Sequence, residues 1–382
     1  MSLTSQIKEL GEEIGLDVIR VTNAENYPET EKQIKFSIEQ GYIPEIAFNN
    51  SIPSSNIDIN KVKRRCNPRS ILKRAKSVIS VAQCYMLEET EDNKKNNERL
   101  LGKIAKYDAG NFYKDTSLKL KKIINFINLK TDSKYKSKNK SCYVSLTEKP
   151  IAERAGVGWY GKNGIIITEG FGSWVVLGEI ITELELEIDS PLYRDCGSCK
   201  ICMDWCPTQA IAAPYIINRT RCLQYISERP MKVPLSFREV WGDRLYGCMT
   251  CQEVCPENHK VKPKKYRPEY GFIGTKIPLI PLLTITEREF QNYFACNQIA
   301  MRSRETIKRN SILVLGNIGD PKALLPLINV LQEDSNAMVR GHSAWALGKI
   351  KDRKGKVALE KALVAEEDRE VKEEIINALE MF

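Results

Sequence analysis

The sequence has no long apolar run. No stretch approaches the roughly 20 apolar residues that a membrane-spanning helix needs. The first ten residues, MSLTSQIKEL, lack the charged-then-apolar pattern of a secretory signal and contain no twin-arginine pair. We therefore expect a cytoplasmic protein that does not contact a membrane.

A strong charge excess is also absent. Lys and Arg together number 58 and Asp and Glu number 49, which gives a formal net charge of +9. An excess of this size permits a nucleic-acid partner but does not require one. The length of 382 residues is enough for two or three domains with cores of their own.

Disulfides are not expected either, although the chain has 12 cysteines. A reducing cytoplasm keeps thiols free, so metal ligation, redox chemistry and packing are the roles open to them. Cys66, Cys84 and Cys296 stand apart from the dense cysteine runs. We interpret these three as small buried apolar residues.

The first 190 residues mix two kinds of periodicity. Apolar residues at helical spacing predict helices over 5–14, 29–40 and 116–129. Runs rich in β-branched residues predict strands over 77–82, 164–168 and 174–181. This mixture is typical of an α/β or α+β domain.

The last 80 or so residues contain a repeat. Val314-Leu315-Gly316, Ala346-Leu347-Gly348 and Ala378-Leu379-Glu380 follow one another at a spacing of 32 residues. A second apolar helix is expected in each gap, over 323–331 and 357–363. Paired helices repeating at this length indicate HEAT-like repeats, and one irregular helical bundle is the alternative.

The cysteines concentrate in two runs. The first run, from Cys196 to Pro207, has the spacing C-x2-C-x2-C-x3-C-P. In bacterial ferredoxin runs of this kind, the first three thiolates bind one four-iron cluster and the fourth binds its neighbour. The second run, from Cys248 to Pro256, has only three cysteines. Two zinc sites, or one cluster plus spare thiols, are the alternatives, but zinc sites usually pair two C-x2-C elements.

Two four-iron clusters need eight thiolates, and the two runs supply seven. We assign the eighth position to Cys222, which lies between the runs. The expected ligands of the first cluster are Cys196, Cys199, Cys202 and Cys255. Those of the second are Cys206, Cys222, Cys248 and Cys251.

Residues 156–161 spell GxGxxG, which is also a dinucleotide-binding fingerprint. That fingerprint should follow a strand and open a helix. Here it follows the segment 150–155, which is better helix than strand. Dinucleotide binding is therefore not the favoured interpretation.

The same region resembles the epoxyqueuosine reductase family. The resemblance rests on CNPRSILKRAKSVISVAQCY at 66–85, AERAGVGWYGKN at 152–163, CLQY at 222–225 and YGCMTCQEVCPEN at 246–258. With the two-cluster run and the helical repeats, it covers nearly the whole chain in the same order. Members of this family depend on cobalamin, are related to reductive dehalogenases, and reduce epoxyqueuosine in tRNA to queuosine.

The resemblance implies an α+β architecture in four parts. These are a cobalamin-binding α/β domain at 1–190, a ferredoxin-like domain with two 4Fe-4S clusters at 191–262, a connector at 263–300 and HEAT-like repeats at 301–382. It also implies that the corrin lies near the turn 161–163. The positions that match corrin contacts are Arg65, Asn163, Ile166, Gln224 and Thr250.

Two active-site positions depart from the family pattern. Where the family has a proton-donating Asp upstream of AERAG, this chain has Cys142, and where the family has Asp-Tyr-His it reads Phe112-Tyr113-Lys114. A thiol is a different acid from a carboxyl group and can also ligate cobalt. We hypothesise that Cys142 faces the cobalt as ligand or proton donor, with Lys114 as a nearby cation. The alternative is a packed Cys142 in a paralogue whose proton donor is lost or moved.

The resemblance also implies tRNA as a partner, recognised at its anticodon stem-loop. We expect a basic wall made by the segment 260–267 and by cations of the repeats. These cations are Arg302, Arg304, Lys308, Arg309 and Arg340. The alternative is a solvated helix face with internal ion pairs to Glu305, Glu333 and Asp334.

Three functions compete at this point. The first is reduction of epoxyqueuosine in tRNA by a monomeric enzyme that takes electrons from a flavodoxin or ferredoxin. The second is reduction of a different substrate with the same cofactors, which the changes at Cys142 and Lys114 favour. The third is a non-catalytic iron–sulfur electron carrier or cobalamin-handling protein.

Overall fold

The computed structural model describes residues 1–44, 59–88, 100–140 and 146–382. Cys142 therefore lies outside the described residues. The chain forms two compact units, each assembled from three separate segments. The first unit contains 1–88, 111–222 and 250–270, and the second contains 89–110, 223–249 and 271–382. The expected domain limits stay predictions, because these units combine segments that are distant in the sequence.

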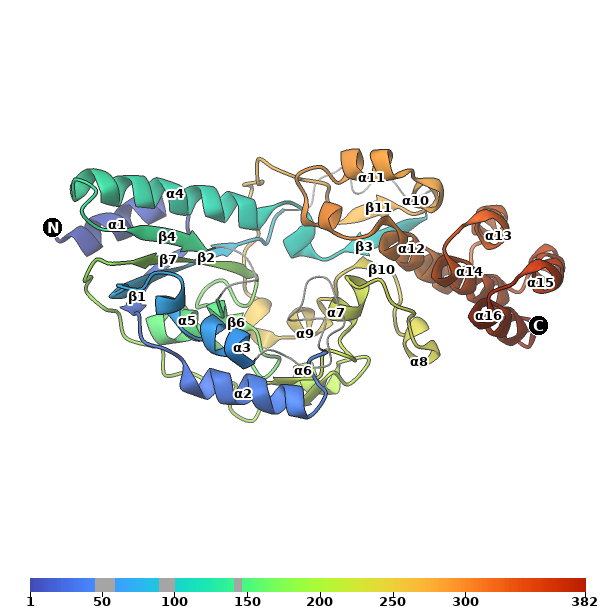
Figure 1. Ribbon diagram of the computed structural model, residues 1–382, viewed down its shortest axis with the longest axis horizontal. Coiled ribbons are helices and arrows are strands. Elements are labelled where there is room, and N and C mark those ends of the chain that lie inside the picture. Colours follow the sequence, from blue (N-terminus) through green and yellow to red (C-terminus); the bar gives the residue numbers. More distant parts are fainter. Residues whose placement is uncertain (45–58, 89–99, 141–145) are drawn as a thin grey trace. The chain divides into compact units, whose positions relative to one another are not determined.

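An antiparallel sheet organises the first unit (Figure 1). Its strand order is β1 (Val18–Asn23), β2 (Ser77–Cys84), β7 (Val175–Thr182) and β4 (Ser137–Lys140). The two long central strands, β2 and β7, pair from Ser77↔Thr182 to Cys84↔Val175. Every residue of β2 is buried, as its β-branched sequence predicts.

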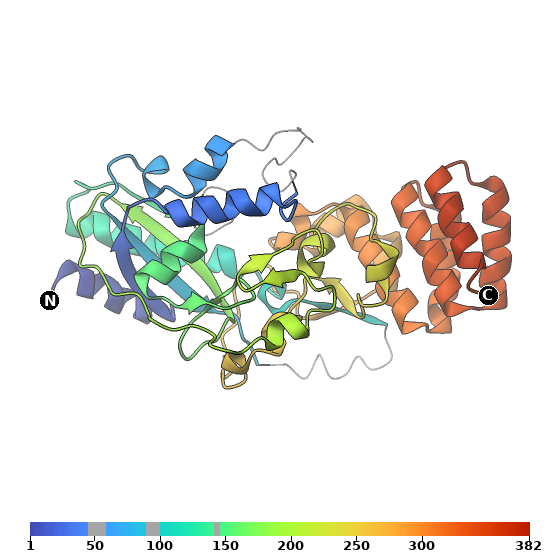
Figure 2. The ribbon, with the colours of Figure 1, turned by 90° about the horizontal axis from the view of Figure 1, so that it is seen from below.

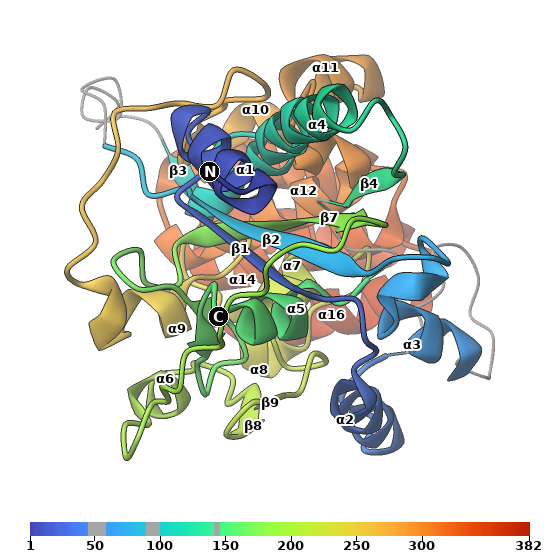
Figure 3. The same ribbon diagram turned by 90° about the vertical axis from the view of Figure 1, so that its left-hand side faces the viewer.

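Helices cover both faces of this sheet (Figure 3). On one face, α1 (Leu3–Glu13) and α4 (Phe112–Lys130) pack against alternate strand residues such as Ile79 and Ile180. On the other face, α5 (Glu148–Ala155) packs against Ala82 and Ile181. The helices α2 (Pro28–Glu39) and α3 (Ile59–Arg65) belong to the same unit. The first unit is thus a mixed α+β structure, as expected.

The cysteine segment of the first unit consists of short elements. They are α6 (Ile201–Asp204), the strand pair β8 (Ile211–Ala213) and β9 (Ile216–Ile217), and α9 (Thr250–Glu253). Residues 156–161, which spell GxGxxG, precede these elements. A hairpin of β5 (Trp159–Tyr160) and β6 (Ile166–Ile167) begins within them. It follows helix α5, and Gly156 ends that helix at φ 78° in the left-handed region. A helix before the run is the opposite of what a dinucleotide fingerprint requires.

Stacked helices form the C-terminal part of the second unit (Figure 2). They are α12 (Arg304–Ile318), α13 (Leu324–Glu333), α14 (Ala337–Ile350), α15 (Arg353–Ala365) and α16 (Arg369–Leu379). The repeated glycines explain how they stack. A Cβ on Gly316 would lie 3.0 Å from the Cα of Ala346, and one on Gly348 would lie 3.0 Å from the Cα of Ala378. The missing side chain therefore lets α12 approach α14, and α14 approach α16, by the same geometry.

The rest of the second unit shares one apolar core with these helices. It contains the sheet β10 (Arg244–Tyr246), β3 (Leu101–Ile104) and β11 (Lys276–Pro278). It also contains α7 (Leu223–Ser227), α8 (Leu235–Arg238), α10 (Ile280–Thr284) and α11 (Glu287–Tyr293). None of the described helices combines the length and apolar character needed to cross a bilayer.

The repeat cations expected to contribute to a basic wall are used inside the second unit. Arg309 is fully buried and donates to the backbone oxygens of Arg229 at 2.8 Å and Ile226 at 3.0 Å. The expectation was wrong for Arg309, because the loop after α7 covers this face of α12. The other four cations lie in ion pairs: Arg302 with Glu228, Arg304 with Glu305, Lys308 with Asp334 and Arg340 with Glu366.

A buried ion pair joins α8 to α16. Both guanidinium Nη atoms of Arg238 donate to the carboxylate of Glu374, at 2.8 and 2.7 Å, and Arg238 has no solvent exposure. Removing one partner of such a pair leaves an uncompensated charge in the core, which typically costs about 3–5 kcal/mol.

We predict that Glu374→Ala lowers the free energy of unfolding by about 3 kcal/mol, because Arg238 then stays buried without its partner. Urea denaturation measures this. Glu370→Ala is the matched control, since this neighbour is exposed and pairs only with Lys232 among the described residues. It should change stability by less than about 1 kcal/mol. Equal losses in the two variants would contradict the assignment.

Candidate functional site

All four members of the first expected thiol set lie in the first unit. Cys196, Cys199 and Cys202 come from the loop around α6, and Cys255 comes from the segment after α9. The pKa of the Cys202 thiol is raised to about 11, first by burial and then by the charges of Cys196, Cys255 and Cys199. Burial, followed by the charges of Cys196 and Glu257, also raises the pKa of Cys255. The expected three-plus-one set is therefore close enough for its members to repel one another.

This repulsion fits an iron–sulfur cluster. Neighbouring thiols hinder one another's ionisation, and binding to a cationic iron centre stabilises their thiolate forms. Lys162 fixes the loop that carries them, because its Nζ donates to the backbone oxygens of Gly197 at 2.6 Å and Cys199 at 2.8 Å. The turn 161–163, expected near the corrin, is thus tied to the first thiol set.

Three members of the second set also lie in the first unit. The Sγ of Cys206 accepts a hydrogen bond from the backbone N–H of Ala210 at 3.2 Å. Cys222 and Cys251 both lie within electrostatic range of Lys149. The fourth expected ligand, Cys248, belongs to the second unit. Convergence of these four thiols therefore stays a prediction.

A group of cations lies beside Cys222 and Cys251. The Nζ of Lys149 donates to the backbone oxygen of Gly164 at 2.6 Å. As a whole residue, Lys149 is exposed to solvent, but its ammonium group is surrounded by protein atoms. This burial, followed by the charge of Arg219, lowers the pKa of the ammonium group to about 8. Burial and Arg219 likewise lower the pKa of Arg65. These cations lie closer together than their charges favour, so the site suits a partner rich in hydrogen-bond acceptors.

The remaining expected corrin residues are divided between the two units. Asn163 and Ile166 are buried in the first unit. The Nδ2 of Asn163 donates to the backbone oxygen of Cys251 at 3.4 Å, and its Oδ1 accepts from the N–H of Ile165 at 3.2 Å. Thr250 begins α9 in the same unit. Gln224 lies on α7 in the second unit and donates to Glu228.

Of the two departing positions, only Lys114 lies in the described part of the chain. It lies in the first turn of α4, where its backbone N–H donates to Asn111 Oδ1 at 2.9 Å. Its side chain is exposed, and its Nζ lies 6.0 Å from the ring centre of Tyr270. The roles proposed for Cys142 and Lys114 stay predictions.

Sequence reasoning missed a buried acid, Glu179 of β7. Its side chain is 0% exposed, and neither carboxyl oxygen has a hydrogen-bond partner among the described residues. It is paired across the sheet with Ser80, whose hydroxyl is also unpartnered there. Burial, reinforced by Glu148, holds the pKa of Glu179 well above its usual range. A single charged residue inside the apolar run VVLGEIIT was the available signal.

Glu148 connects this acid to the cation group. Burial raises the pKa of Glu148 to about 7, although Lys149 and Arg65 oppose the shift. Its Oε1 also has no hydrogen-bond partner within the described ranges. Two carboxyl groups with raised pKa values therefore lie on the α5 side of the sheet, near Arg65.

The second unit holds another buried acid that the sequence did not reveal. Asp108 is 2% exposed, and burial, followed by Glu228, holds its pKa well above the usual value, against the effect of Arg302. Arg302 donates to the Tyr246 hydroxyl at 2.8 Å and to Glu228 at 3.0 Å. Arg302 is therefore part of an internal network.

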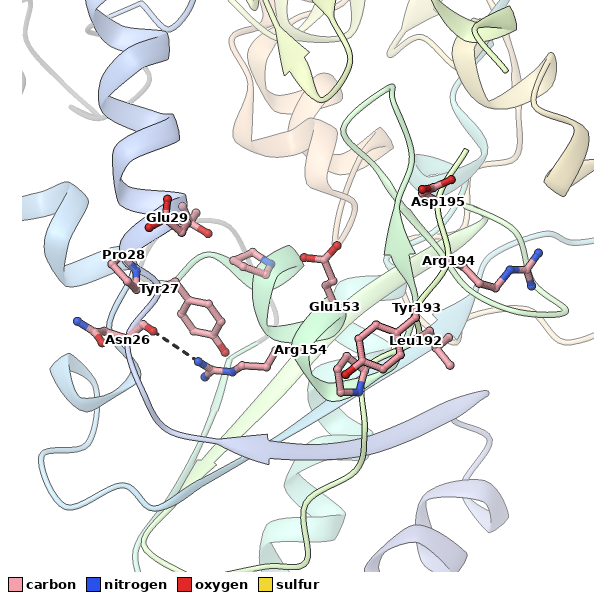
Figure 4. A pocket seen from close by; sticks show the side chains of 13 residues that line it. Asn26, Tyr27, Pro28, Glu29, Glu153, Arg154, Leu192, Tyr193, Arg194 and Asp195 are labelled. Carbon is pink, nitrogen blue, oxygen red and sulfur yellow. Dashed lines mark hydrogen bonds between the residues drawn. The ribbon is translucent and has the colours of Figure 1, made fainter. Parts of the chain in front are cut away.

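A pocket of about 820 Å³ lies elsewhere in the first unit (Figure 4). Arg154 lies beside Tyr27 there, with its guanidinium carbon 3.8 Å from the ring centre. The Nη2 of Arg154 donates to the backbone oxygens of Asn23 and Glu25, both at 2.9 Å, and its Nε donates to the Thr22 hydroxyl. The guanidinium thus holds the backbone after β1, which is a structural role.

Three family profiles match the chain. They are a 4Fe-4S double cluster binding domain at 195–258, HEAT repeats at 296–380, and "Epoxyqueuosine reductase QueG, DUF1730" at 65–140. The α+β class, the double-cluster domain and the C-terminal HEAT repeats are thereby confirmed. The interpretation of the cysteine runs as two zinc sites is not supported.

Curated relatives match over the full length. An epoxyqueuosine reductase of Bacillus subtilis is 33% identical over 100% of this chain and 96% of its own. One from Staphylococcus aureus is 30% identical over 96% of this chain and 93% of its own.

Solved structures match equally broadly. A selenomethionine-labelled epoxyqueuosine reductase has a TM-score of 0.90 at 33% identity, covering 99% of this chain and 98% of its own. An epoxyqueuosine reductase with an epoxyqueuosine-modified tRNA-Tyr stem loop has a TM-score of 0.89 at 33% identity, with the same coverage.

We predict that Cys199→Ala removes the first cluster and lowers the iron content from about eight to about four per chain. Iron analysis and visible absorbance of anaerobic protein measure this. Cys296→Ala is the matched control, because Cys296 lies outside both runs and is exposed. The interpretation of Cys296 as a buried residue was therefore wrong, whereas Cys66 and Cys84 are buried as expected. Full iron content in Cys199→Ala would contradict the ligand assignment.

We predict that Glu179→Gln stabilises the protein increasingly as pH rises. The folded chain keeps the Glu179 proton above pH 4.5, where the unfolded chain releases it, so the native carboxyl costs stability with rising pH. Each pH unit adds up to about 1.4 kcal/mol. Urea unfolding at pH 5 and pH 8 tests this, with the exposed Glu13→Gln as control. A difference between Glu179→Gln and wild type that does not change with pH would contradict the assignment.

Proposed function

The chain belongs to the epoxyqueuosine reductase family, and we propose that it reduces epoxyqueuosine to queuosine in tRNA with two 4Fe-4S clusters and cobalamin. The observation that carries this proposal is the full-length similarity to epoxyqueuosine reductases, one of them solved with a modified tRNA stem loop. The double cluster binding domain matched at 195–258 supports the redox part, because 4Fe-4S clusters bound there would supply one-electron chemistry.

The reaction has a definite electron and proton requirement. Converting the epoxide to an alkene takes two electrons and two protons and releases one water. A four-iron cluster passes one electron at a time, so two clusters can supply the pair in succession. The reaction also needs acids, and the raised pKa values of Glu148 and Glu179 support the presence of such groups in the first unit.

The residues of the first unit fit cobalamin. Bound cobalamin would supply a cobalt centre able to attack or reduce the strained ring. Arg65, Lys149 and Arg219 gather positive charge whose closeness favours an acceptor-rich ligand, and the amide and phosphate groups of cobalamin provide such acceptors. Asn163 and Ile166 would hold the corrin beside them, together with Thr250 and with Gln224 of the second unit.

The proton donor is the part of the proposal at which this chain departs from the family pattern. We retain Cys142 as the group facing the cobalt, as ligand or proton donor, with Lys114 as a nearby cation. The paired replacement of the family's Asp and His supports this hypothesis.

We predict that Cys142→Ala reduces turnover at least about tenfold and changes the absorbance spectrum of bound cobalamin, because the group facing the cobalt is lost. Cys84→Ala is the matched control, since this thiol is buried in the sheet. Unchanged turnover and spectrum in Cys142→Ala would exclude the hypothesis.

The second candidate function is reduction of a different substrate with the same cofactors. Its support is the change of both active-site positions, Cys142 and Lys114. Nucleoside analysis of tRNA from a strain lacking the gene separates the two candidates. Accumulated epoxyqueuosine supports the leading proposal, and normal queuosine content supports the paralogue.

tRNA is the proposed macromolecular partner, as in the relative solved with a stem loop. Because the repeat cations of the expected basic wall lie in internal ion pairs or are buried, the exposed lysines of its other part, the segment 260–267, are the better candidates for phosphate contacts. These include Lys260, Lys262 and Lys265. A filter-binding titration with tRNA at increasing salt should show affinity that falls with ionic strength.

A further inference from the structure

Two segments of the first unit hold the positive excess of the chain. Residues 59–76 contain eight Lys and Arg residues, residues 134–140 contain four, and neither segment contains an acidic residue. Together they carry a formal charge of +12, whereas the whole chain carries +9, so the remaining residues are slightly negative. The moderate net charge of the protein therefore hides one strongly basic region.

The fold brings these two segments together. The strand that follows the first segment, β2, and the strand in the second, β4, pair with opposite edges of β7. Glu183, which directly follows β7, accepts hydrogen bonds from both segments, from Arg74 Nε at 2.9 Å and from the backbone N–H of Lys136 at 3.1 Å. The Nζ of Lys138 also donates to the backbone oxygen of Ile71 at 3.1 Å. The two groups of cations thus belong to one surface.

Six exposed cations lie on the joined segments, and we call them the basic surface. They are Arg69, Lys73, Arg74, Lys134, Lys136 and Lys138. Within the described ranges, Arg74 is the one member with an ion-pair partner, which is Glu183. Arg69 and Lys138 donate to backbone oxygens, which carry no net charge. The repeat cations, by contrast, are buried or paired, so the basic surface keeps the charge that they lose.

The basic surface adjoins the cation group of the proposed corrin site. Arg65 belongs both to the segment 59–76 and to that cation group. Its backbone oxygen accepts from the N–H of Thr147, the residue before α5, at 2.9 Å. The turn that leads from there to the basic surface is held by the Ser70 hydroxyl, which donates to the backbone oxygen of Arg64 at 2.7 Å. A nucleoside bound at the proposed site would therefore bring the phosphates of its own strand toward the basic surface.

Protection of the sheet edge does not explain all of these charges. β4 is an edge strand, and lysines on an edge strand prevent pairing with another chain. Arg69 and Lys73 lie outside this strand, however, in the segment that precedes β2. Like charges that gather without acids repel one another and destabilise the folded state. Cations beyond the edge strand therefore point to a polyanion that offsets their repulsion.

RNA is the polyanion that the surroundings favour. Lys and Arg side chains neutralise backbone phosphates and release the counterions that these phosphates hold. Tyr135 lies between two lysines of the basic surface and is 41% exposed, and an exposed ring of this kind can stack on an unpaired base. An anionic membrane would also attract cations, but the neighbouring nucleoside site favours RNA.

We propose that the basic surface binds the backbone phosphates of the tRNA whose nucleoside enters the proposed site. This inference rests on the proposed function and adds a surface of the first unit, distinct from the repeat cations expected from the sequence. Phosphate contacts fix the position of a nucleic acid but do not read its sequence. The basic surface would therefore orient the tRNA, while the pocket selects the nucleoside.

The test measures the affinity of the cluster-loaded protein for a transcript of tRNA-Tyr by filter binding at several salt concentrations. The basic-surface variant combines Lys73→Gln, Lys134→Gln and Lys136→Gln. It should weaken binding at least about tenfold at about 0.1 M salt and lower the salt slope by about two, because each lost phosphate contact lowers it by about one. Arg at the same three positions keeps the charge and should keep the affinity within about twofold.

A matched control variant lies on α15 of the second unit. It combines Lys354→Gln, Lys356→Gln and Lys361→Gln, which are also three exposed lysines. The change in net charge is the same, so an affinity within about twofold of wild type would show that the position of the charges matters. Iron content and urea denaturation show whether each variant is folded and loaded.

Several outcomes would overturn the proposal. Unchanged tRNA affinity in the basic-surface variant, or an equal loss in the α15 variant, would show that these lysines do not form a specific phosphate site. Weaker binding to phosphatidylglycerol vesicles with unchanged tRNA affinity would assign the surface to a membrane. Aggregation of the variant with unchanged tRNA affinity would assign the lysines to protection of the sheet edge.

The binding measurement needs no turnover, so it separates the two proposals. Wild-type protein that binds tRNA through the basic surface but does not convert epoxyqueuosine would refute the proposed function alone. Conversion of epoxyqueuosine with the same KM for tRNA in wild type and the basic-surface variant would refute the basic surface alone. A phosphate contact outside the reacting centre should raise the KM for tRNA and leave kcat within about twofold of wild type.

Discussion

Mutual repulsion among thiolates is the constraint on which the site depends. Burial, followed by the charges of neighbouring cysteines, raises the pKa of Cys202 and Cys255, so ionising the members of this set together is unfavourable unless a cation binds them. Iron binds the thiolates, and its positive charge offsets their mutual repulsion. The protein therefore needs rigid supports that hold the thiols together, and the lysine that clamps the loop carbonyls is one of them. That lysine belongs to the turn expected beside the corrin, so the same few residues would connect the electron pathway with the reacting centre.

The buried acids show a second use of unfavourable electrostatics. The carboxyl groups of Glu179 and Asp108 are buried, each within its own unit. Their removal from water lowers the stability of the folded protein. A fold selected for stability alone would replace a carboxyl group such as that of Glu179, which has no hydrogen-bond partner among the described residues, with an apolar side chain. Within the first unit, a buried acid such as Glu179, whose pKa burial raises, is consistent with chemistry that consumes protons.

The sequence predicted the parts whose pattern is local. The β-branched run of β2, the helical spacing of α4 and the C-x2-C-x2-C-x3-C-P run are each decided by residues close together in the chain. The 32-residue repeat was also visible, and Gly316 and Gly348 give its physical reason. The fate of individual charges was not predictable. Arg309 lies in a charged stretch that reads as exposed, and only the distant loop after α7 buries it. Glu179 required knowledge of which sheet face α5 covers.

The discontinuous make-up of the two units constrains how the protein can be synthesised and divided. The first unit is complete only when residue 270 has been translated, by which time the segment 223–249 of the second unit has already been synthesised. Cleavage of the chain at any single bond between residues 89 and 270 leaves at least one unit split between the two fragments. The electron-transfer and repeat portions are therefore poor candidates for independent modules, and shuffling them between proteins by simple fusion would break the native connectivity.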